Sequence, residues 1–159
     1  AVQAFASPDV GALGRMEEGI PHFRRRVLTR HTCESKFDLA GVTSLPYVPI
    51  LYGHAGADAR LARAAIESGA AGIVHAGTGN GSIHEALLAT FADAAGKGIP
   101  IVRASRTGAG AVLFAESAYE DAGFIDADTL PPAKARILLA LALLKTNDRN
   151  EIRRIFREY

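Results

Sequence analysis

The segment GIVHAGTGNGS, residues 72–82, decides the fold, because an apolar run of β type stops there at a glycine-dense turn. Glycine adopts backbone conformations that other residues avoid, so we expect a strand that ends in a tight turn. A helix is expected to begin directly afterwards. Backbone N–H groups that are uncovered at a helix N-terminus suit carboxylates or phosphates, so the turn is a candidate binding site for small anions. The residues that form this turn are Gly77, Gly79, Asn80 and Gly81.

Ser82 is the expected first residue of that helix. With Glu85 it forms the S-x-x-E pattern of a capping box, in which each side chain satisfies a backbone N–H group of the first helical turn. Capping is much commoner than catalysis, so helix energetics alone account for Ser82 when it is taken in isolation.

Strand-like and helix-like segments alternate around this turn. Apolar β-type runs lie at residues 47–53, 72–77 and 100–105, and helices are expected near residues 58–68 and 82–97. This alternation predicts a parallel sheet with right-handed crossovers. Apolar residues at helical spacing predict that each helix covers the sheet. They are Leu61, Ala62, Ala65 and Ile66 in the first helix, and Ile83, Leu87, Phe91 and Ala94 in the second.

The C-terminal third begins with a connection, residues 107–123, that is long for a loop and is acidic near its end. Loops of this length are usually functional or poorly ordered. A short strand is expected at Phe124 and Ile125, followed by a helix from Pro132 through ARILLALALLK. Apolar residues surround nearly the whole of that helix, so one side is expected to face another subunit. Asp148 and Glu151 are expected to cap a last helix, DRNEIRRIFREY.

The first forty residues differ from the rest. Turn-forming residues around EEG predict a β-hairpin that turns at Gly19, and a basic linker follows to Phe37. We therefore divide the chain into a hairpin and linker, residues 1–40, and an α/β domain, residues 41–159. The predicted fold class is α/β, with a small parallel sheet, helices on both of its faces, and the hairpin and linker in front.

Composition excludes several functions. The 159 residues carry 18 basic and 17 acidic side chains, which argues against dedicated binding of nucleic acid or a membrane surface. Cys33 is the single cysteine, and the five histidines lack the spacing of metal ligands, so neither a metal nor another cofactor is expected. The longest apolar stretch, residues 137–144, is far shorter than the roughly 20 residues that span a membrane.

A nucleotide-binding module is the alternative interpretation. GTGNGS partly matches the dinucleotide fingerprint G-x-G-x-x-G, although Ser82 replaces the third glycine. Arg103 and Arg106 are expected to follow the next strand, where a basic side chain can accept a 2′-phosphate. In this interpretation the turn binds a nucleotide or an acidic ligand without turnover.

Six motifs taken together resemble the C-terminal part of bacterial type II L-asparaginases and glutaminase-asparaginases. They occur in the family's order and spacing, and GALGRMEEGIPHFRRRVLTRHT resembles the hairpin and linker that join the two domains of these enzymes. The resemblance covers almost the whole chain and implies a Rossmann- or flavodoxin-like domain. The motifs are FDL at Phe37, LPYVPILYG, GIVHAGTGNGS, PIVRASRTGAG, KARILLALALLKT and IFREY.

The resemblance implies that this chain carries no catalytic residue. The family's nucleophilic threonine lies in a TGGTIA-type motif and its activating relay in an HGTDT-type motif, and neither TGGT nor HGTDT occurs in these residues. The implied partners are therefore an N-terminal asparaginase domain and further copies in a homo-oligomer, expected to be a tetramer. The implied activity is hydrolysis of L-asparagine, and of L-glutamine as well, to the acid and ammonia. A type II enzyme implies a periplasmic location, with a cytoplasmic one left open.

Two substrate-binding residues follow from the resemblance. In the family, this domain completes the active site of a neighbouring subunit through one position in the glycine turn and one in the long loop. Ser82 matches the first position, and Glu116 matches the glutamate that contacts the substrate's α-amino group. The two roles suit a free amino acid, whose carboxylate and ammonium need opposite partners.

Overall fold

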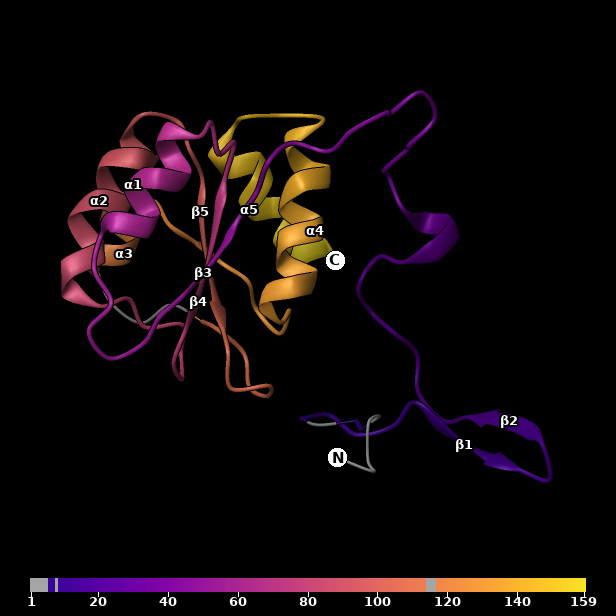
Figure 1. The fold of residues 1–159 in the computed structure, drawn as a ribbon. Coiled ribbons are helices and arrows are strands. Elements are labelled where there is room, and N and C mark those ends of the chain that lie inside the picture. Colours follow the sequence, from indigo (N-terminus) through magenta and orange to yellow (C-terminus); the bar gives the residue numbers. More distant parts are fainter. Residues whose placement is uncertain (1–5, 8, 114–116) are drawn as a thin grey trace.

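The computed structural model describes residues 6–7, 9–113 and 117–159, which form an α/β body preceded by a hairpin and a linker (Figure 1). Four parallel strands form the sheet in the order β3-β4-β5-β6. Every residue of the two central strands is buried, as expected for a parallel sheet that is covered on both faces. The strands are β3 (Ile50–Tyr52), β4 (Ile73–Gly77), β5 (Ile101–Ser105) and β6 (Ile125–Asp126).

Helices cover both faces of the sheet, which confirms the predicted fold class (Figure 1). On one face lie α1 (Arg60–Glu67), α2 (Glu85–Gly96) and α3 (Ser117–Asp121). On the other lie α4 (Pro132–Leu143) and α5 (Arg149–Glu158). Each face has its own apolar core, and the two cores are separated by the sheet. None of the described helices is long and apolar enough to cross a membrane.

Several details of the predicted helices need correction. The second helix begins at Glu85 and not at Ser82, because Ser82 pairs with Thr78 in an isolated β-bridge. The connection at residues 107–123 is not all loop, since α3 lies within it. Leu61 is 68% exposed and does not share the buried face of α1 with Ala62 and Ala65. In α5, by contrast, the predicted Asp148 cap is confirmed, because its side chain accepts from two backbone N–H groups.

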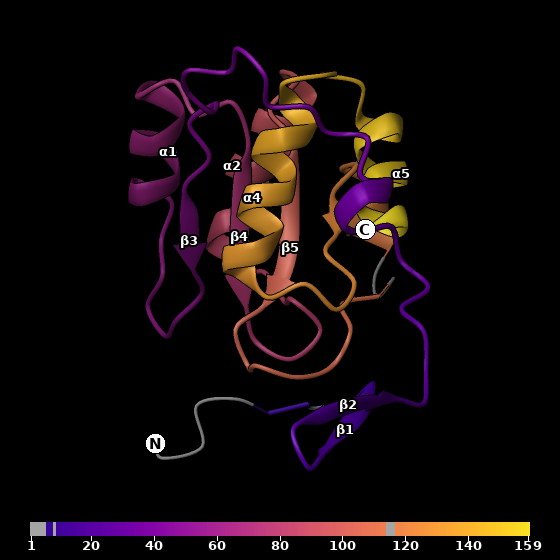
Figure 2. The same cartoon turned by 90° about the vertical axis from the view of Figure 1, so that its right-hand side faces the viewer.

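The predicted hairpin is present as β1 (Gly14–Glu17) and β2 (Ile20–Phe23). Glu18 and Gly19 connect them with φ angles of 49° and 82°, which fits the two-residue turn that suits the twist of a hairpin. Both views place the hairpin apart from the body, on the side of the carboxyl edge of the sheet (Figures 1 and 2).

The linker returns from the hairpin to the body along the end of α5 (Figure 2). It contains a short 3-10 helix, η1 (Thr32–Glu34). The backbone N–H of Arg30 donates to the Glu158 carbonyl at 2.6 Å, and the backbone N–H of Lys36 donates to the Tyr159 hydroxyl at 2.6 Å. The ring of Phe37 also lies 5.1 Å from that of Tyr159. The linker is therefore attached to the C-terminal end of the last helix.

Candidate functional site

The glycine turn lies at the carboxyl edge of the sheet, where β4 ends. In α/β folds, this edge is where ligands bind. The Ser82 N–H donates to the Thr78 carbonyl at 3.0 Å and closes the turn. Gly79 and Gly81 have φ angles of 48° and 67°, a region that side chains disfavour. The predicted turn is thus present, although it is a closed loop between two bridged residues and not the N-terminus of a helix.

Gly77 is required for a different reason, because the turn leaves no room for a side chain at this position. A β-carbon at this position would lie 2.8 Å from the Ser82 nitrogen and closer still to the Ser82 carbonyl oxygen. Both are backbone atoms and cannot rotate away. The last residue of β4 therefore has to be glycine for the turn to fold back against the strand.

Ser82 has a different local role from the one its sequence pattern predicts. Ser82 is exposed. The helix α2 is capped by His84, whose Nδ1 accepts the Ala86 N–H at 3.2 Å. The capping box with Glu85 is therefore wrong, and so is the expectation that uncovered helix amides line the turn. The Ser82 hydroxyl makes no hydrogen bond to any residue that the structure describes, so it remains accessible to a ligand.

His75 supports the turn from within the strand β4. It lies in β4, is completely buried, and its Nε2–H donates to the Ser82 carbonyl at 3.1 Å. The ring of Phe91 packs against it edge to face at 5.5 Å. Burial lowers the pKa of His75, because a charged imidazolium would lose its hydration, and the hydrogen bond to Ser82 only opposes this shift. A neutral His75 thus holds the backbone of the proposed substrate-binding residue.

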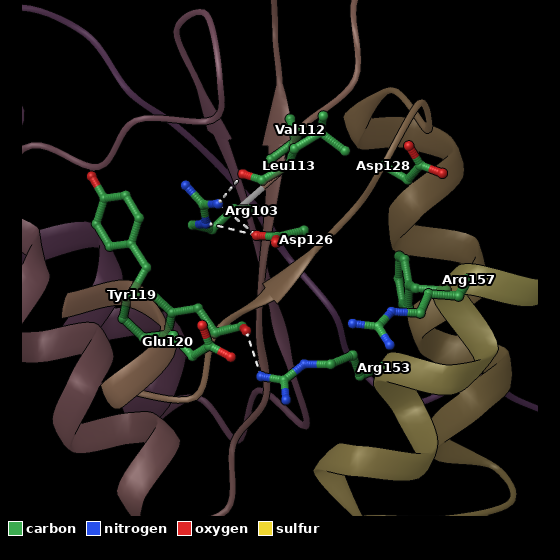
Figure 3. Close-up of a pocket in the computed structure, with 11 residues that line it drawn as sticks. Arg103, Val112, Leu113, Tyr119, Glu120, Asp126, Asp128, Arg153 and Arg157 are labelled. Carbon is green, nitrogen blue, oxygen red and sulfur yellow. Dashed lines mark hydrogen bonds and ion pairs between the residues drawn. The ribbon is translucent and has the colours of Figure 1, made fainter. Parts of the chain in front are cut away.

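Arg103 joins the turn to the loop that follows β5, and Figure 3 shows its contacts with Leu113 of that loop and with Asp126. Its side chain lies in the middle of the buried strand β5 and is 1% exposed. Its Nη1 donates to the Asn80 carbonyl at 3.2 Å, and its Nη2 donates to the Leu113 carbonyl at 3.0 Å. The neighbouring strand supplies the counter-charge, since Asp126 Oδ1 accepts from Nε at 3.0 Å and from Nη2 at 2.5 Å.

Two further contacts connect the same segments. The Asn80 side chain accepts the Leu113 N–H at 2.8 Å, so this turn residue binds the loop with its side chain as well as its carbonyl. Tyr119 of α3 places its ring 4.4 Å from the Arg103 guanidinium, and its hydroxyl accepts the Ile83 N–H at 3.2 Å. The turn is therefore held from both flanks of the loop. Glu116 itself lies outside the described residues.

A cavity of about 260 Å³ opens beside this cluster (Figure 3). Side chains of both charges line it. Arg153 reaches in from α5 and donates to the Phe124 carbonyl at 3.1 Å. The charged residues in its wall are Arg103, Arg153, Arg157, Glu120, Asp126 and Asp128.

Comparison with known proteins agrees with this geometry. Residues 47–156 match the family described as the glutaminase/asparaginase C-terminal domain. The chain belongs to this family.

Relatives of the asparaginase family align with nearly all of the chain. L-asparaginase 2 of Escherichia coli is 39% identical, over 99% of this chain and 46% of the relative. The glutaminase-asparaginase of Pseudomonas fluorescens is 38% identical, over 99% of this chain and 44% of the relative. The chain thus spans about half the length of the curated relatives it matches.

A solved structure in the same family has the same fold. It is described as a probable cytoplasmic L-asparaginase from Campylobacter jejuni, and it superimposes with a TM-score of 0.92 at 42% identity. The match covers 100% of this chain and 52% of that one. Both the resemblance and the fold predicted from the motifs are therefore confirmed.

The nucleotide-binding alternative loses its main support inside this asparaginase domain. Arg103 does not follow the strand but lies within it, and four of its N–H groups already have acceptors in the protein. It cannot leave them for a 2′-phosphate without leaving Asp126 unpaired. Arg106 is exposed beyond the end of β5 and donates through its backbone N–H to the Gly77 carbonyl.

The contacts by which Arg103, Asp126 and His75 hold the turn are not among the predictions from the sequence. A usable signal was present, because fully buried parallel strands are nearly all apolar and each charged or polar residue within one needs a buried partner. IVRAS contains an arginine at its centre, and Asp126 lies opposite it in the register of β5 and β6.

Proposed function

We propose that this chain forms part of the substrate site of an L-asparaginase-type amidohydrolase, which converts L-asparagine and water to L-aspartate and ammonia and also acts on L-glutamine. The observation that carries the proposal is the exposed Ser82, held by its backbone on a rigid glycine turn at the carboxyl edge of the sheet. Membership of the asparaginase family supports the choice of substrate. The names of the relatives, L-asparaginase and glutaminase-asparaginase, support both amides.

Ser82 and Glu116 are the proposed substrate-binding residues. Ser82 would bind at the carboxylate end of the amino acid, and Glu116 would bind its α-ammonium group. Gly77, Gly79, Asn80 and Gly81 would fix the position of Ser82. None of these groups attacks the amide, so the chemistry would come from a threonine of an N-terminal asparaginase domain, through an acyl-enzyme that water resolves.

The proposed assembly is a homo-oligomer, a tetramer, in which this domain completes the active site of a neighbouring subunit. Exposed apolar side chains on the outer side of α4 support it, since Ile137 is 44% exposed and Leu144, directly after the helix, is 39% exposed. Light scattering of the purified complete protein should give a mass several times that of one subunit. A monomer that binds no apolar dye would contradict the assembly. The division of the chain at residues 40 and 41 is retained as part of this proposal.

The first test separates the two halves of the enzyme. Ammonia release from L-asparagine and from L-glutamine is measured for this chain alone, for an N-terminal domain alone, and for the two mixed. We expect no turnover by this chain alone and turnover after mixing. Turnover by the isolated chain would contradict the proposed division of labour. A parallel titration with dinucleotides and with L-aspartate tests the alternative, which requires binding of the nucleotide.

The second test addresses the two binding residues in the complete enzyme. Ser82→Asn changes the size and hydrogen-bonding capacity beside the substrate, so we expect a shift in the asparagine-to-glutamine ratio of kcat/KM. Glu116→Ala removes a charged partner and should weaken transition-state binding, calculated from the ratio of kcat/KM values, by about 1–3 kcal/mol. Asp121→Ala, in α3 on the same connection but exposed and outside the wall of the cavity, is the matched control and should keep the kcat/KM of the wild type. If Ser82→Asn and Glu116→Ala both retain wild-type kinetics for L-asparagine and L-glutamine, the site assignment is wrong.

The proposed location is the periplasm, in agreement with the resemblance to type II enzymes. The Campylobacter relative is described as cytoplasmic, so the location needs its own test. Fractionation of the source cells, followed by detection of the complete protein, should find it in the periplasmic fraction.

A further inference from the structure

We propose that Arg103, paired with Asp126, is a positioning residue for the substrate site. It would hold the turn at residues 77–82 and both flanks of the connection at residues 107–123 in one fixed arrangement. The part of this inference that concerns substrate rests on the proposed function. The part that concerns the arrangement of the two segments rests on geometry alone.

The Arg103 side chain joins segments that lie far apart in the chain. The Arg103 guanidinium donates to the carbonyl of Asn80 in the turn and to the carbonyl of Leu113 in the connection. Its face lies against the ring of Tyr119 at 4.4 Å, on the other flank of that connection. An ion pair that served only the sheet would need Asp126 and neither of these carbonyls. The contacts therefore extend from the sheet to the two segments that carry the proposed substrate-binding residues.

The contacts at this position require an arginine side chain. A guanidinium is planar and directs its N–H donors in a fixed fork, so several acceptors around it are held at defined angles. Here Asp126 occupies one side of the fork, and the two backbone carbonyls occupy the rest. A lysine ammonium carries one charge on a flexible chain and has no such plane. A lysine at this position would keep the charge near Asp126 but lose the fixed geometry.

Two neighbouring hydrogen bonds depend on the same arrangement of the turn and the connection. Asn80 Oδ1 accepts the Leu113 N–H at 2.8 Å, and the Tyr119 hydroxyl accepts the Ile83 N–H at 3.2 Å. Each bond joins the turn region to one flank of the connection, and Arg103 contacts three of these four residues. Loss of the guanidinium should therefore loosen the turn and the connection together, while the rest of the sheet stays folded.

The experiment compares Arg103→Lys, Arg103→Met and Asp126→Asn in the complete protein. Arg136→Met is the matched control, because Arg136 Nε donates to the Val48 carbonyl at 2.8 Å at the opposite edge of the sheet. Backbone hydrogen exchange is followed by mass spectrometry in peptides that cover the turn, the connection and α4. We expect exchange at least about tenfold faster in the turn and the connection for all three variants, with α4 unchanged. The control should leave the turn unchanged.

Kinetics give the second measurement. If the guanidinium positions substrate-binding groups, KM for L-asparagine should rise about tenfold in Arg103→Met, and less in Arg103→Lys, while kcat per folded enzyme stays within about threefold. A purely structural residue would lower the amount of folded enzyme and leave KM unchanged. Wild-type exchange in the turn of Arg103→Lys, or an unchanged KM in the folded variants, would overturn the proposal.

The two proposals fail separately. If the wild-type complete protein releases no ammonia from either amide, the proposed function fails, and hydrogen exchange still decides whether Arg103 holds the two segments. If Arg103→Met does not fold, Arg103→Lys and Asp126→Asn decide the outcome, because both retain a polar group of similar size.

Discussion

The site turn at residues 77–82 and the hairpin turn at Glu18 and Gly19 both reverse the chain with positive φ angles, but they differ in what surrounds them. A β-carbon on Gly19 would meet nothing within 4 Å, and the strands beside it expose large apolar side chains such as Phe23. The site turn is packed against His75 and Arg103, which are both buried. The hairpin is therefore specified by its local sequence, whereas the site turn also depends on Arg103, which comes from the next strand.

The largest effect is expected for Gly77→Ala, which tests this difference between the two turns. The new β-carbon would meet backbone atoms of Gly81 and Ser82 at less than normal contact distance, so the turn would have to move away from β4. We expect the free energy of unfolding to fall by about 3 kcal/mol, at the upper end of the usual cost of overpacking. Urea denaturation measures it. A loss below about 1 kcal/mol would mean that the turn is as loosely held as the hairpin.

The second test uses pH and sharpens the comparison at His75. Its pKa is lowered in the folded protein, so below about pH 6.5 the unfolded chain binds a proton that the folded protein does not. The free energy of unfolding should therefore have its full value above this pH. It should fall by up to about 1.4 kcal/mol per pH unit as the pH drops toward the pKa of His75 in the folded protein. Urea denaturation between pH 7 and pH 5 measures the slope.

Two variants control this measurement. His75→Gln keeps a donor for the Ser82 carbonyl but has no imidazole to titrate, so the slope should become smaller. Leu28→Gln places the same amide at an exposed position of the linker that does not titrate, and it should leave the slope as it is in the wild type. An equal slope in all three proteins would show that the buried histidine does not link pH to stability.

The third test is Gly19→Ala, the hairpin counterpart of the first. Space is available, and only the positive φ of 82° opposes a side chain. A left-handed conformation costs an ordinary residue about 1–2 kcal/mol. We therefore expect the free energy of unfolding, measured by urea denaturation, to fall by about 1 kcal/mol. A loss as large as that of Gly77→Ala would break the distinction between the two turns.

The smallest effect is expected for Ser82→Ala. If Ser82 capped α2, its loss would cost about 1 kcal/mol. In the structure the cap is His84, so Ser82→Ala should change the free energy of unfolding by less than about 0.5 kcal/mol, while His84→Ala should cost more. Thermal unfolding of the two variants side by side gives the order. A larger loss of stability for Ser82→Ala than for His84→Ala would indicate that Ser82 caps α2 after all.

Much of the fold could be predicted because its signals are local. The alternation of apolar runs predicted the parallel sheet, and the EEG turn predicted the hairpin. The start of α2 was wrong because S-x-x-E is a local pattern, while the position of Ser82 is decided by its bridge to Thr78. The proposed substrate contact at Ser82 came from the family's motifs, and no physical signal in the turn alone would have selected it.

The surroundings of the site were harder to predict. Arg103 was interpreted as a free basic residue after a strand, because the sequence does not show that Asp126 lies opposite it. Only the register of β5 and β6 brings the two together, across 23 positions of the chain. Pairings of this kind depend on tertiary structure, so the glycine turn at the end of β4 could be predicted from the sequence, while the residues that support it could not.

The attachment of the linker to α5 has a consequence for the order of folding. The bond from the Lys36 N–H to the Tyr159 hydroxyl joins residues that are 123 positions apart. The entropy lost when two chain segments meet grows with the length of the loop between them, so contacts of such long range form after local ones. During refolding, the hairpin needs only residues that are close in the chain, whereas the linker contacts to Glu158 and Tyr159 cannot form until α5 is in place. The segment that precedes the α/β body in the chain is thus among the last to be fixed to it.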